Sequence, residues 1–444
     1  MSNQYLTLYH QHRQLLDSHS VPLFNDKRGA AAASFERLGL PSQKVERFKY
    51  TDIRSAFEPD YGLNLSRLRI PVNPYEAFRC DVPNLSTSVY FVVNDSFYRD
   101  AQPKASLPDG VVVDSLCSDQ SAILAAPYFA TLADVNTDAV AALNTMLSQD
   151  GLLIYVPAGV CIERPIQVVN IMRGDVPLMA NRRILVVAEA NSHVRILLCD
   201  HAADEQDFLS TQVTEVFVGE GAEVEFYELE ETHARCHRFA QFYSDVHASG
   251  RLTHASITLS CGLTRNQTDV RLVGRGAEAN LLGCAISDAE QHIDNNTLIE
   301  HSAPACSSHE LYKYVVDQQS TGAFAGRILV HEEAQQTDSD ERNANLVCTP
   351  QARMYTQPML EIYADDVKCS HGSTVGQLSD EALFYMLQRG ISEADARLLL
   401  KQAFASEVID RISLVPLRDR LHLLIDKRFR GELAQCRTCR LCGR

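Results

Sequence analysis

The chain lacks the features that mark membrane, secreted and nucleic-acid-binding proteins. Its 444 residues include no tryptophan and no apolar run of about 18 residues, the minimum for a membrane-spanning helix. The opening stretch, MSNQYLTLYHQHRQLLDSHS, has no apolar core of the kind a secretory signal needs. Positive charge is in deficit, and the net charge of −16 argues against adhesion to nucleic acids or anionic membranes. We therefore expect a cytoplasmic protein that binds neither nucleic acid nor membrane.

Motifs of several enzyme classes are also missing. The chain has no G-x-x-x-x-G-K-[ST] phosphate loop, no G-x-S-x-G nucleophile elbow and no H-E-x-x-H zinc motif. His331-Glu332-Glu333 lacks the second histidine of that zinc motif, and a solvated loop is the simpler interpretation. The thirteen cysteines are odd in number and spread along the chain, which predicts reduced thiols and no disulfide framework.

What the chain does have is a long region, from Asp150 to about residue 378, of short β-rich runs. Small and polar residues recur before these runs, at Glu189-Ala190-Asn191, Gly221-Ala222-Glu223, Gly250-Arg251-Leu252 and Gly276-Ala277-Glu278. The recurrences lie roughly 26 to 32 residues apart, which fits one coil of a stacked solenoid. Stacking buries the apolar face that one coil leaves uncovered, so the pattern favours a parallel β-helix. A β-sandwich is the alternative, but the tight Asn-Gly and Asp-Gly hairpins typical of it are scarce.

Helical patterns on both sides of the β region divide the chain into four expected parts. These are a mixed, mainly helical domain at 1–149, a parallel β-helix core at 150–378, a helical domain at 379–430 and a cysteine-containing tail at 431–444. Helix signals in the third part predict helices at 379–389, 392–412 and 417–425. We expect these helices to cover the end of the solenoid, because open strand edges promote aggregation.

Cys369 and His371 are the first candidate site. They lie on a predicted strand, where residues two apart point to the same face. A thiolate and an imidazole are borderline-soft ligands that suit iron, zinc or copper. Two ligands do not complete a metal site, so an ordinary strand with a buried thiol and a surface imidazole is the alternative.

Other cysteines and histidines form weaker candidates. The tail carries Cys436, Cys439 and Cys442 in a C-x-x-C-x-x-C spacing, which could hold zinc or an iron–sulfur cluster with a fourth ligand from elsewhere. Two further groups have ligand chemistry at short range but are more simply interpreted as turns: His233 with Cys236 and His237, and Cys306 with His301 and His309.

Three blocks of the sequence resemble the SufD side of the SufB/SufD family, the scaffold subunits of the SUF iron–sulfur cluster assembly system. Glu46-Arg47-Phe48-Lys49-Tyr50-Thr51 is similar to the family's E-x-W-K-Y-T signature, with phenylalanine at the tryptophan position. Residues 150–167, from DGLLIYVPAGV to PIQ, are similar to the start of its β-helix. Residues 364–390, ADDVKCSHGSTVGQL followed by EALFYMLQRG, match its most specific block.

The resemblance implies a mainly β fold, a right-handed parallel β-helix flanked by N-terminal and C-terminal helical domains. It implies a non-enzymatic scaffold that pairs with a SufB-like subunit and binds a SufC-like ATPase through its C-terminal helical domain. His371 and, with less support, Cys369 are the implied ligands of a transient iron–sulfur cluster shared with the partner subunit; no cofactor is expected to bind tightly to this chain alone. An acidic EHEA-type stretch of SufB is replaced here by Ser370-His371-Gly372-Ser373, which favours the SufD side.

The helix predicted at 392–412 carries an apolar stripe formed by Leu398, Leu399, Ala403 and Val408. We interpret this stripe as the surface for the ATPase. Two alternatives to the scaffold hypothesis stay open: a β-helix polysaccharide lyase or hydrolase with catalytic carboxylates, and a homodimeric structural protein that pairs through its strand edges.

Overall fold

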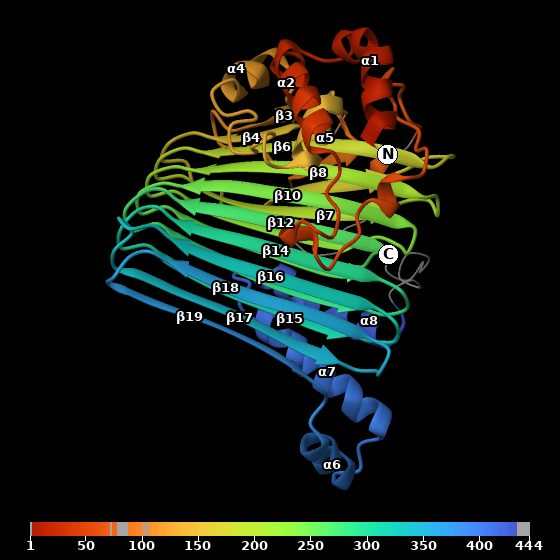
Figure 1. The fold of residues 1–444 in the computed structure, drawn as a ribbon, viewed down its shortest axis with the longest axis vertical. Helices are drawn as coiled ribbons and strands as arrows, with labels where there is room; N and C mark the ends of the chain where they lie inside the picture. Colours follow the sequence, from red (N-terminus) through yellow and green to blue (C-terminus); the bar gives the residue numbers. More distant parts are fainter. Residues whose placement is uncertain (1, 72, 78–87, 101–102, 104, 433–444) are drawn as a thin grey trace.

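The computed structural model describes residues 2–71, 73–77, 88–100, 103 and 105–432, and its centre is a solenoid of two facing β-sheets (Figure 1). One sheet has ten strands and contains β1 (Val89–Val93), β2 (Ser96–Phe97), β5 (Ile166–Met172), β7 (His193–Ala202), β9 (Glu223–Glu231), β11 (Arg251–Ser260), β13 (Glu278–Ser287), β15 (Ser307–Val316), β17 (Thr337–Val347) and β19 (Val367–Gly376). The other has nine and contains β3 (Val112–Ser115), β4 (Leu152–Val156), β6 (Leu178–Ala188), β8 (Phe208–Val218), β10 (Cys236–Val246), β12 (Leu263–Leu272), β14 (His292–His301), β16 (Thr321–Val330) and β18 (Arg353–Ile362).

Helices flank this solenoid. They are α1 (Ser2–Ser18), α2 (Pro22–Leu38), α3 (Pro74–Ala77), α4 (Asp119–Ala125), α5 (Ala139–Leu147), α6 (Asp380–Gln388), α7 (Glu393–Ile409) and α8 (Val415–Phe429), with two 3₁₀ turns, η1 (Glu46–Phe48) and η2 (Ser55–Phe57). From β4 onward, successive strands alternate between the two sheets and pair in parallel with the strand one coil away. The predicted parallel β-helix between helical regions is therefore confirmed, and the sandwich is excluded.

The turn motif seen in the sequence marks the corner between the two sheets. One residue in each of these corners adopts a positive φ, and these residues are Asn191, Gly221, Ser249, Gly276, Ala305 and Gln336. The left-handed conformation favours glycine because it has no Cβ, and glycine occupies it at φ 64° in Gly221 and φ 70° in Gly276. The backbone N–H of Gly221 donates to the carbonyl of Ala248, 2.9 Å away in the next coil. The spacing that predicted a solenoid thus follows a left-handed residue that recurs at this corner from coil to coil.

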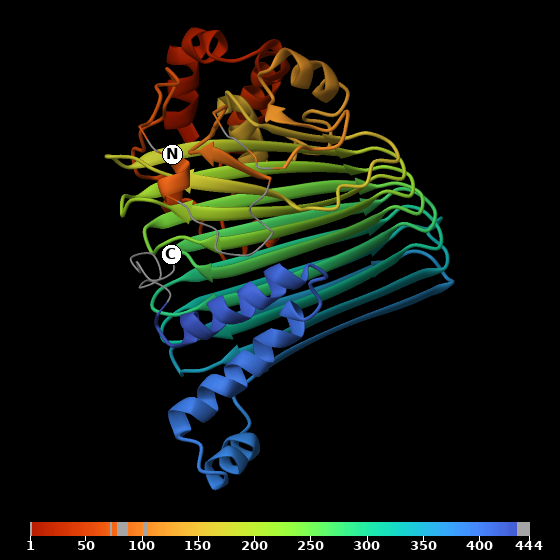
Figure 2. The ribbon, with the colours of Figure 1, turned by 180° about the vertical axis from the view of Figure 1, so that it is seen from behind.

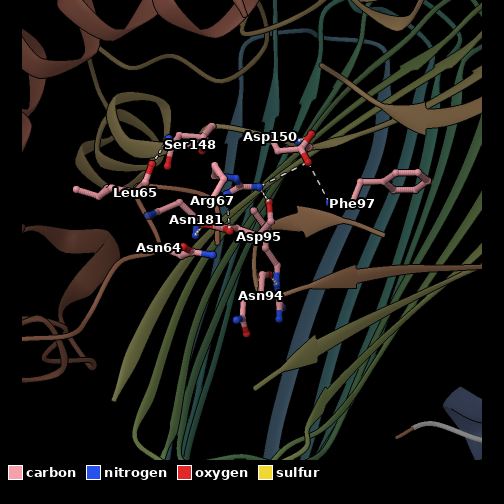
Figure 3. A network of polar contacts seen from close by, with 12 residues as sticks. Asn64, Leu65, Arg67, Asn94, Asp95, Phe97, Ser148, Asp150 and Asn181 are labelled. Carbon is pink, nitrogen blue, oxygen red and sulfur yellow. Dashed lines mark hydrogen bonds and ion pairs between the residues drawn. The ribbon is translucent and has the colours of Figure 1, made fainter. Parts of the chain in front are cut away.

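The beginning of the solenoid is closed by short antiparallel strands and a buried ionic network. β2 pairs antiparallel with β1, and β3 pairs antiparallel with β4. The Arg67 guanidinium lies 2.7 Å from a carboxylate oxygen of Asp95 and 3.6 Å from one of Asp150, as Figure 3 shows. Asp150 also accepts hydrogen bonds from the backbone N–H groups of Phe97 and Gly151. The charges at this end are therefore satisfied within the chain, and its end strands are short.

The N-terminal region covers the outer face of the nine-stranded sheet. Apolar residues of α1, α2 and α5 pack there against Met179, Leu209 and Phe239. The segment 46–51 then crosses later strands: Arg47 lies 2.6 Å from Asp269 on β12, and the Thr51 hydroxyl donates to Asp294 on β14. The signature-like block therefore works as a strap that fastens the N-terminal region to the solenoid.

The C-terminal helices cover the outer face of the ten-stranded sheet, as Figure 2 shows. Helices α6, α7 and α8 correspond to the three that the sequence predicts, with somewhat different ends. The expectation that they cover the end of the solenoid is wrong, because α7 and α8 bury their apolar faces against strands such as β13 and β15. β18 and β19 are the last strands of their sheets in the described structure, and each is paired on one side only. The final coil thus presents two open strand edges.

Candidate functional site

Cys369 and His371 lie on β19, at the open edge of the ten-stranded sheet. In the ladder between β17 and β19, Cys369 is opposite Ser339 and His371 is opposite Glu341. His371 is exposed, and no hydrogen bond or ion pair engages its ring among the residues described. The imidazole is therefore accessible at the rim of the solenoid, where a second chain could reach it.

Cys369 is held more deeply than His371. Its side chain is half-buried and packs beside Ile328, Val330 and Ala364, which line the interior of the last coil. Burial, with a smaller contribution from the Asp338 carboxylate, raises the pKa of the Cys369 thiol. The thiol is thus protonated at neutral pH and must lose its proton when it binds a metal ion. This geometry makes His371 the more readily available ligand of the two.

The row of interior side chains that ends at His371 changes character along the solenoid. One coil apart in turn, the ladders align Phe226, His254, Leu281, Glu310, Glu341 and His371. Phe226 and Leu281 belong to the apolar core between the sheets. In the two coils before His371, the same row instead carries the buried carboxyl groups of Glu310 and Glu341. The sequence analysis missed them, although their separation by one coil length from each other and from His371 was a usable signal.

The four helical residues predicted to bind an ATPase do not form one surface. Leu398 is half-buried, while Leu399 and Ala403 are exposed. Val408 is fully buried, in the core that joins α7 and α8 to the ten-stranded sheet. The prediction that Val408 contacts a partner is therefore wrong, because its side chain already packs within the chain.

Helix α6 offers a larger apolar surface than the predicted stripe. Phe384 and Tyr385 are 63% and 60% exposed, and Leu387 on the same helix is 39% exposed. No residue of α6 is buried, and Figures 1 and 2 show the helix projecting beyond the last coil. The helical period of these residues was visible in the sequence, but their exposure depends on where the helix lies.

The weaker cysteine and histidine candidates do not gather into metal sites. His301 is buried and hydrogen-bonded to Ser308, Cys306 donates to the carbonyl of Gly274, and His309 pairs with Asp340 at the surface. His331 pairs with Glu300 at 2.6 Å. His233 lies 3.4 Å from the Cys236 sulfur, but its Nε2 is also 2.7 Å from the carbonyl oxygen of Asp204, and burial lowers the pKa of His237. Cys436, Cys439 and Cys442 lie outside the described residues.

One cluster with metal-ligand chemistry was not expected from the sequence. His193, Glu223 and Glu225 bring ligand atoms within 4.8 Å of one another on the surface of the ten-stranded sheet. Arginines already neutralise both carboxylates: Arg251 lies 2.8 Å from Glu223 and Arg195 lies 3.3 Å from Glu225. The cluster is therefore satisfied as an ionic network.

The chain is thus a parallel β-helix with helices on both outer faces and, at its last coil, open strand edges that carry Cys369 and His371. A profile for the SUF system FeS cluster assembly SufBD core domain matches residues 170–404, and one for the SufBD protein N-terminal region matches residues 1–168. The chain belongs to the SufBD family of iron–sulfur cluster assembly proteins.

Several proteins are similar to this chain along nearly its whole length. An iron–sulfur cluster assembly SufBD family protein of Synechocystis is 28% identical over 94% of this chain and 90% of its own length. The iron–sulfur cluster assembly protein SufD of Escherichia coli is 27% identical over 89% of this chain and 90% of its own. The chloroplastic protein ABCI7 of Arabidopsis thaliana is 29% identical over 90% of this chain and 85% of its own. The resemblance found in the sequence is confirmed. Among the described residues, none of the helices combines the length and apolarity needed to cross a lipid bilayer.

Proposed function

We propose that this chain is a non-enzymatic scaffold subunit that pairs with a SufB-like subunit through its last coil. The carrying observation is that β18 and β19 are each paired on one side only while His371 is exposed on that edge. Unpaired backbone N–H and C=O groups on an edge strand are a template for a strand of another chain. Tyr363 and Val375, exposed by 64% and 52% near this edge, add apolar surface for such a contact.

The transient iron–sulfur cluster is the substrate of this interface. His371 supplies an imidazole and Cys369 a thiol, and both suit iron. Iron in protein-bound clusters is held by several such ligands, so two from this chain need completion by the partner. This incompleteness supports a shared, releasable cluster and no tightly bound cofactor on the chain alone.

Helix α6, with the neighbouring start of α7, is the proposed surface for a SufC-like ATPase. Exposed aromatic side chains such as Phe384 and Tyr385 are typical of the residues that dominate binding energy at interfaces. They lie on a helix that contributes nothing to the buried core. Leu399 and Ala403 extend the exposed surface along α7, so part of the predicted stripe stays in this proposal.

Purification of the complex tests the proposal. The full chain is co-expressed with a SufB-like subunit and a SufC-like ATPase, and the complex is analysed for mass, iron and acid-labile sulfide. We expect a complex of all three chains in which iron and sulfide depend on His371. A chain that stays alone, or that forms a self-paired dimer which a SufB-like subunit does not displace, would contradict the heteromeric scaffold and favour the homodimer. Family membership favours assembly over polysaccharide cleavage.

A further inference from the structure

Two carboxyl groups inside the last coils have no counter-charge. Glu310 on β15 and Glu341 on β17 are opposite each other in their parallel ladder, and their side chains are 1% and 0% exposed. No side chain of the described structure pairs with the Glu341 carboxyl group, and only the Thr297 hydroxyl approaches that of Glu310. An unpaired buried carboxylate is costly, so this pair requires an explanation.

Every other buried carboxylate in the described chain has a partner. Asp95 and Asp150 meet Arg67, Asp200 meets Arg182, Glu215 meets Arg183, Glu225 meets Arg195, Glu228 meets Arg238, Asp294 meets Arg265, and Glu230 accepts from Thr232 and Thr264. The other buried acids of the described chain are therefore neutralised or hydrogen-bonded, with an arginine in almost every case. Glu310 and Glu341 are the exception, and they are neighbours.

Two residues of the facing sheet, Gly326 and Thr297, lie against the pair. Gly326 is directly across the interior: a Cβ there would come 2.5 Å from the Glu341 carboxyl carbon, where it would clash. Thr297, opposite Gly326 in the ladder, has a buried hydroxyl close enough to Glu310 to lower the pKa of its carboxyl group. Two carboxyl groups and a hydroxyl form a donor set preferred by hard divalent cations.

The charge of the pair has two possible resolutions. Neighbouring parallel strands are about 4.8 Å apart, so two ionised carboxylates at this separation repel strongly in a dry interior. Burial raises the pKa of both groups. The pair is therefore either neutral through bound protons or charged and compensated by a cation.

We propose that Glu310 and Glu341 bind one divalent metal ion of the oxygen-preferring type inside the open end of the solenoid, one coil before His371. Thr297 and water complete the coordination, and the ion displaces the protons of both carboxyl groups. The exposed last coil gives the ion a route from solvent. This site does not depend on the scaffold proposal, because its ligands all come from this chain.

Mn²⁺ tests the site, because it is paramagnetic and prefers oxygen ligands over thiols. The purified full-length chain, free of other metals, is titrated with Mn²⁺ at about pH 7, where the buried carboxyl groups still hold the protons that the ion displaces, and bound ion is measured by electron paramagnetic resonance. We expect one tightly bound Mn²⁺ and proton release into a weakly buffered solution. Glu310→Gln and Glu341→Gln should each weaken binding at least about tenfold, and Gly326→Ala should weaken it by displacing the Glu341 carboxyl group.

Three variants serve as matched controls. Glu230→Gln removes a buried carboxyl group that is already hydrogen-bonded, Glu223→Gln removes one from the surface cluster with His193, and His371→Ala removes the exposed imidazole. All three should retain the tightly bound Mn²⁺. Wild-type protein that binds no Mn²⁺, or that binds it without releasing protons, overturns the proposal even if the glutamine variants fail to fold. Unchanged binding in folded Glu310→Gln and Glu341→Gln proteins overturns it as well and shows a neutral acid pair. Cluster assembly is not part of this measurement, so the two proposals can fail separately.

Discussion

The rings of Tyr50 and Tyr355 are stacked, with centroids 4.7 Å apart and planes inclined by 13°. Tyr50 belongs to the N-terminal strap, and Tyr355 lies on β18 in the final coil. Stacked aromatic pairs of this kind contribute about 0.5–1.5 kcal/mol beyond their buried area. The contact fixes an edge strand that has no neighbour on its other side, so the open edge is held ready for a partner.

His371→Ala is expected to lower cluster yield several-fold in the co-expressed complex without changing the fold. The side chain is exposed and unpaired, so stability should change by less than about 0.5 kcal/mol. Iron and sulfide per complex, together with a thermal melt, measure both effects. Ser370→Ala is the control, because Ser370 is equally exposed on the same strand but points to the opposite face. Equal cluster content in wild type and His371→Ala would remove the imidazole from the mechanism.

Val375→Lys is expected to weaken pairing with the SufB-like subunit while the isolated chain stays folded. A lysine on an edge strand opposes further strand pairing because its charge must be desolvated. Size-exclusion chromatography with light scattering of the mixed subunits reports the loss of the complex. Val176→Lys is the control, since Val176 is similarly exposed, at 59%, but lies far from this edge, before β6. A complex equally stable in both variants would contradict docking through the last coil.

Phe384→Ala and Val408→Ala are expected to have opposite effects. Phe384 is exposed on α6, so its removal should weaken ATPase binding by about 1–2 kcal/mol or more and leave the melting temperature nearly unchanged. Val408 is fully buried, so its truncation should destabilise the chain by about 1–3 kcal/mol and alter binding little in the folded fraction. Titration of the ATPase and thermal unfolding separate the two. The reverse pattern would place the ATPase elsewhere.

Mild acid is expected to destabilise the solenoid through His254. This imidazole is 1% exposed and stacks on Phe242, and burial, followed by the charge of Arg238, lowers its pKa to about 3. Below about pH 6.5 the unfolded chain binds a proton at His254 that the folded chain does not bind. The free energy of unfolding therefore decreases as the pH is lowered, by up to about 1.4 kcal/mol per pH unit. This loss should continue until the pH reaches the folded pKa.

In the His254→Phe variant, the free energy of unfolding should decrease less between neutral and mildly acidic pH. A series of denaturant melts across this pH range measures the difference. A ring of similar size keeps the stacking contact with Phe242 but cannot bind a proton. The exposed His247→Gln variant should retain the wild-type pH dependence. An unchanged decrease in the phenylalanine variant would mean that other groups cause the acid sensitivity.

The sequence predicts the solenoid well because each coil repeats the same local residue pattern. Residues such as Gly221 and Gly276 mark the left-handed corners, and alternation marks the strands between them. The same local signals find α6, α7 and α8 to within a few residues. Where these helices pack is a different matter: the apolar stripe containing Val408 fits the chain's own sheet as well as it would fit a partner, and periodicity cannot distinguish the two.

The candidate site is predicted in part for a similar reason. Cys369 and His371 are two residues apart, so their shared face follows from strand geometry. Glu310 and Glu341 come together with His371 only through register between coils, which depends on the length of every intervening turn. That Glu310 and Glu341 have no arginine partner follows only from the three-dimensional structure, which shows the arginines paired with other buried acids.

The difference between the two ends of the solenoid limits how large an assembly can grow. Association through the last coil uses the only long, unprotected edges that the described chain offers, while the first strands are short and antiparallel. Two subunits that pair through their last coils would cover these edges, and the described part of each chain would offer no second long edge for strand pairing. Such pairing would favour a closed dimer over a filament of stacked solenoids.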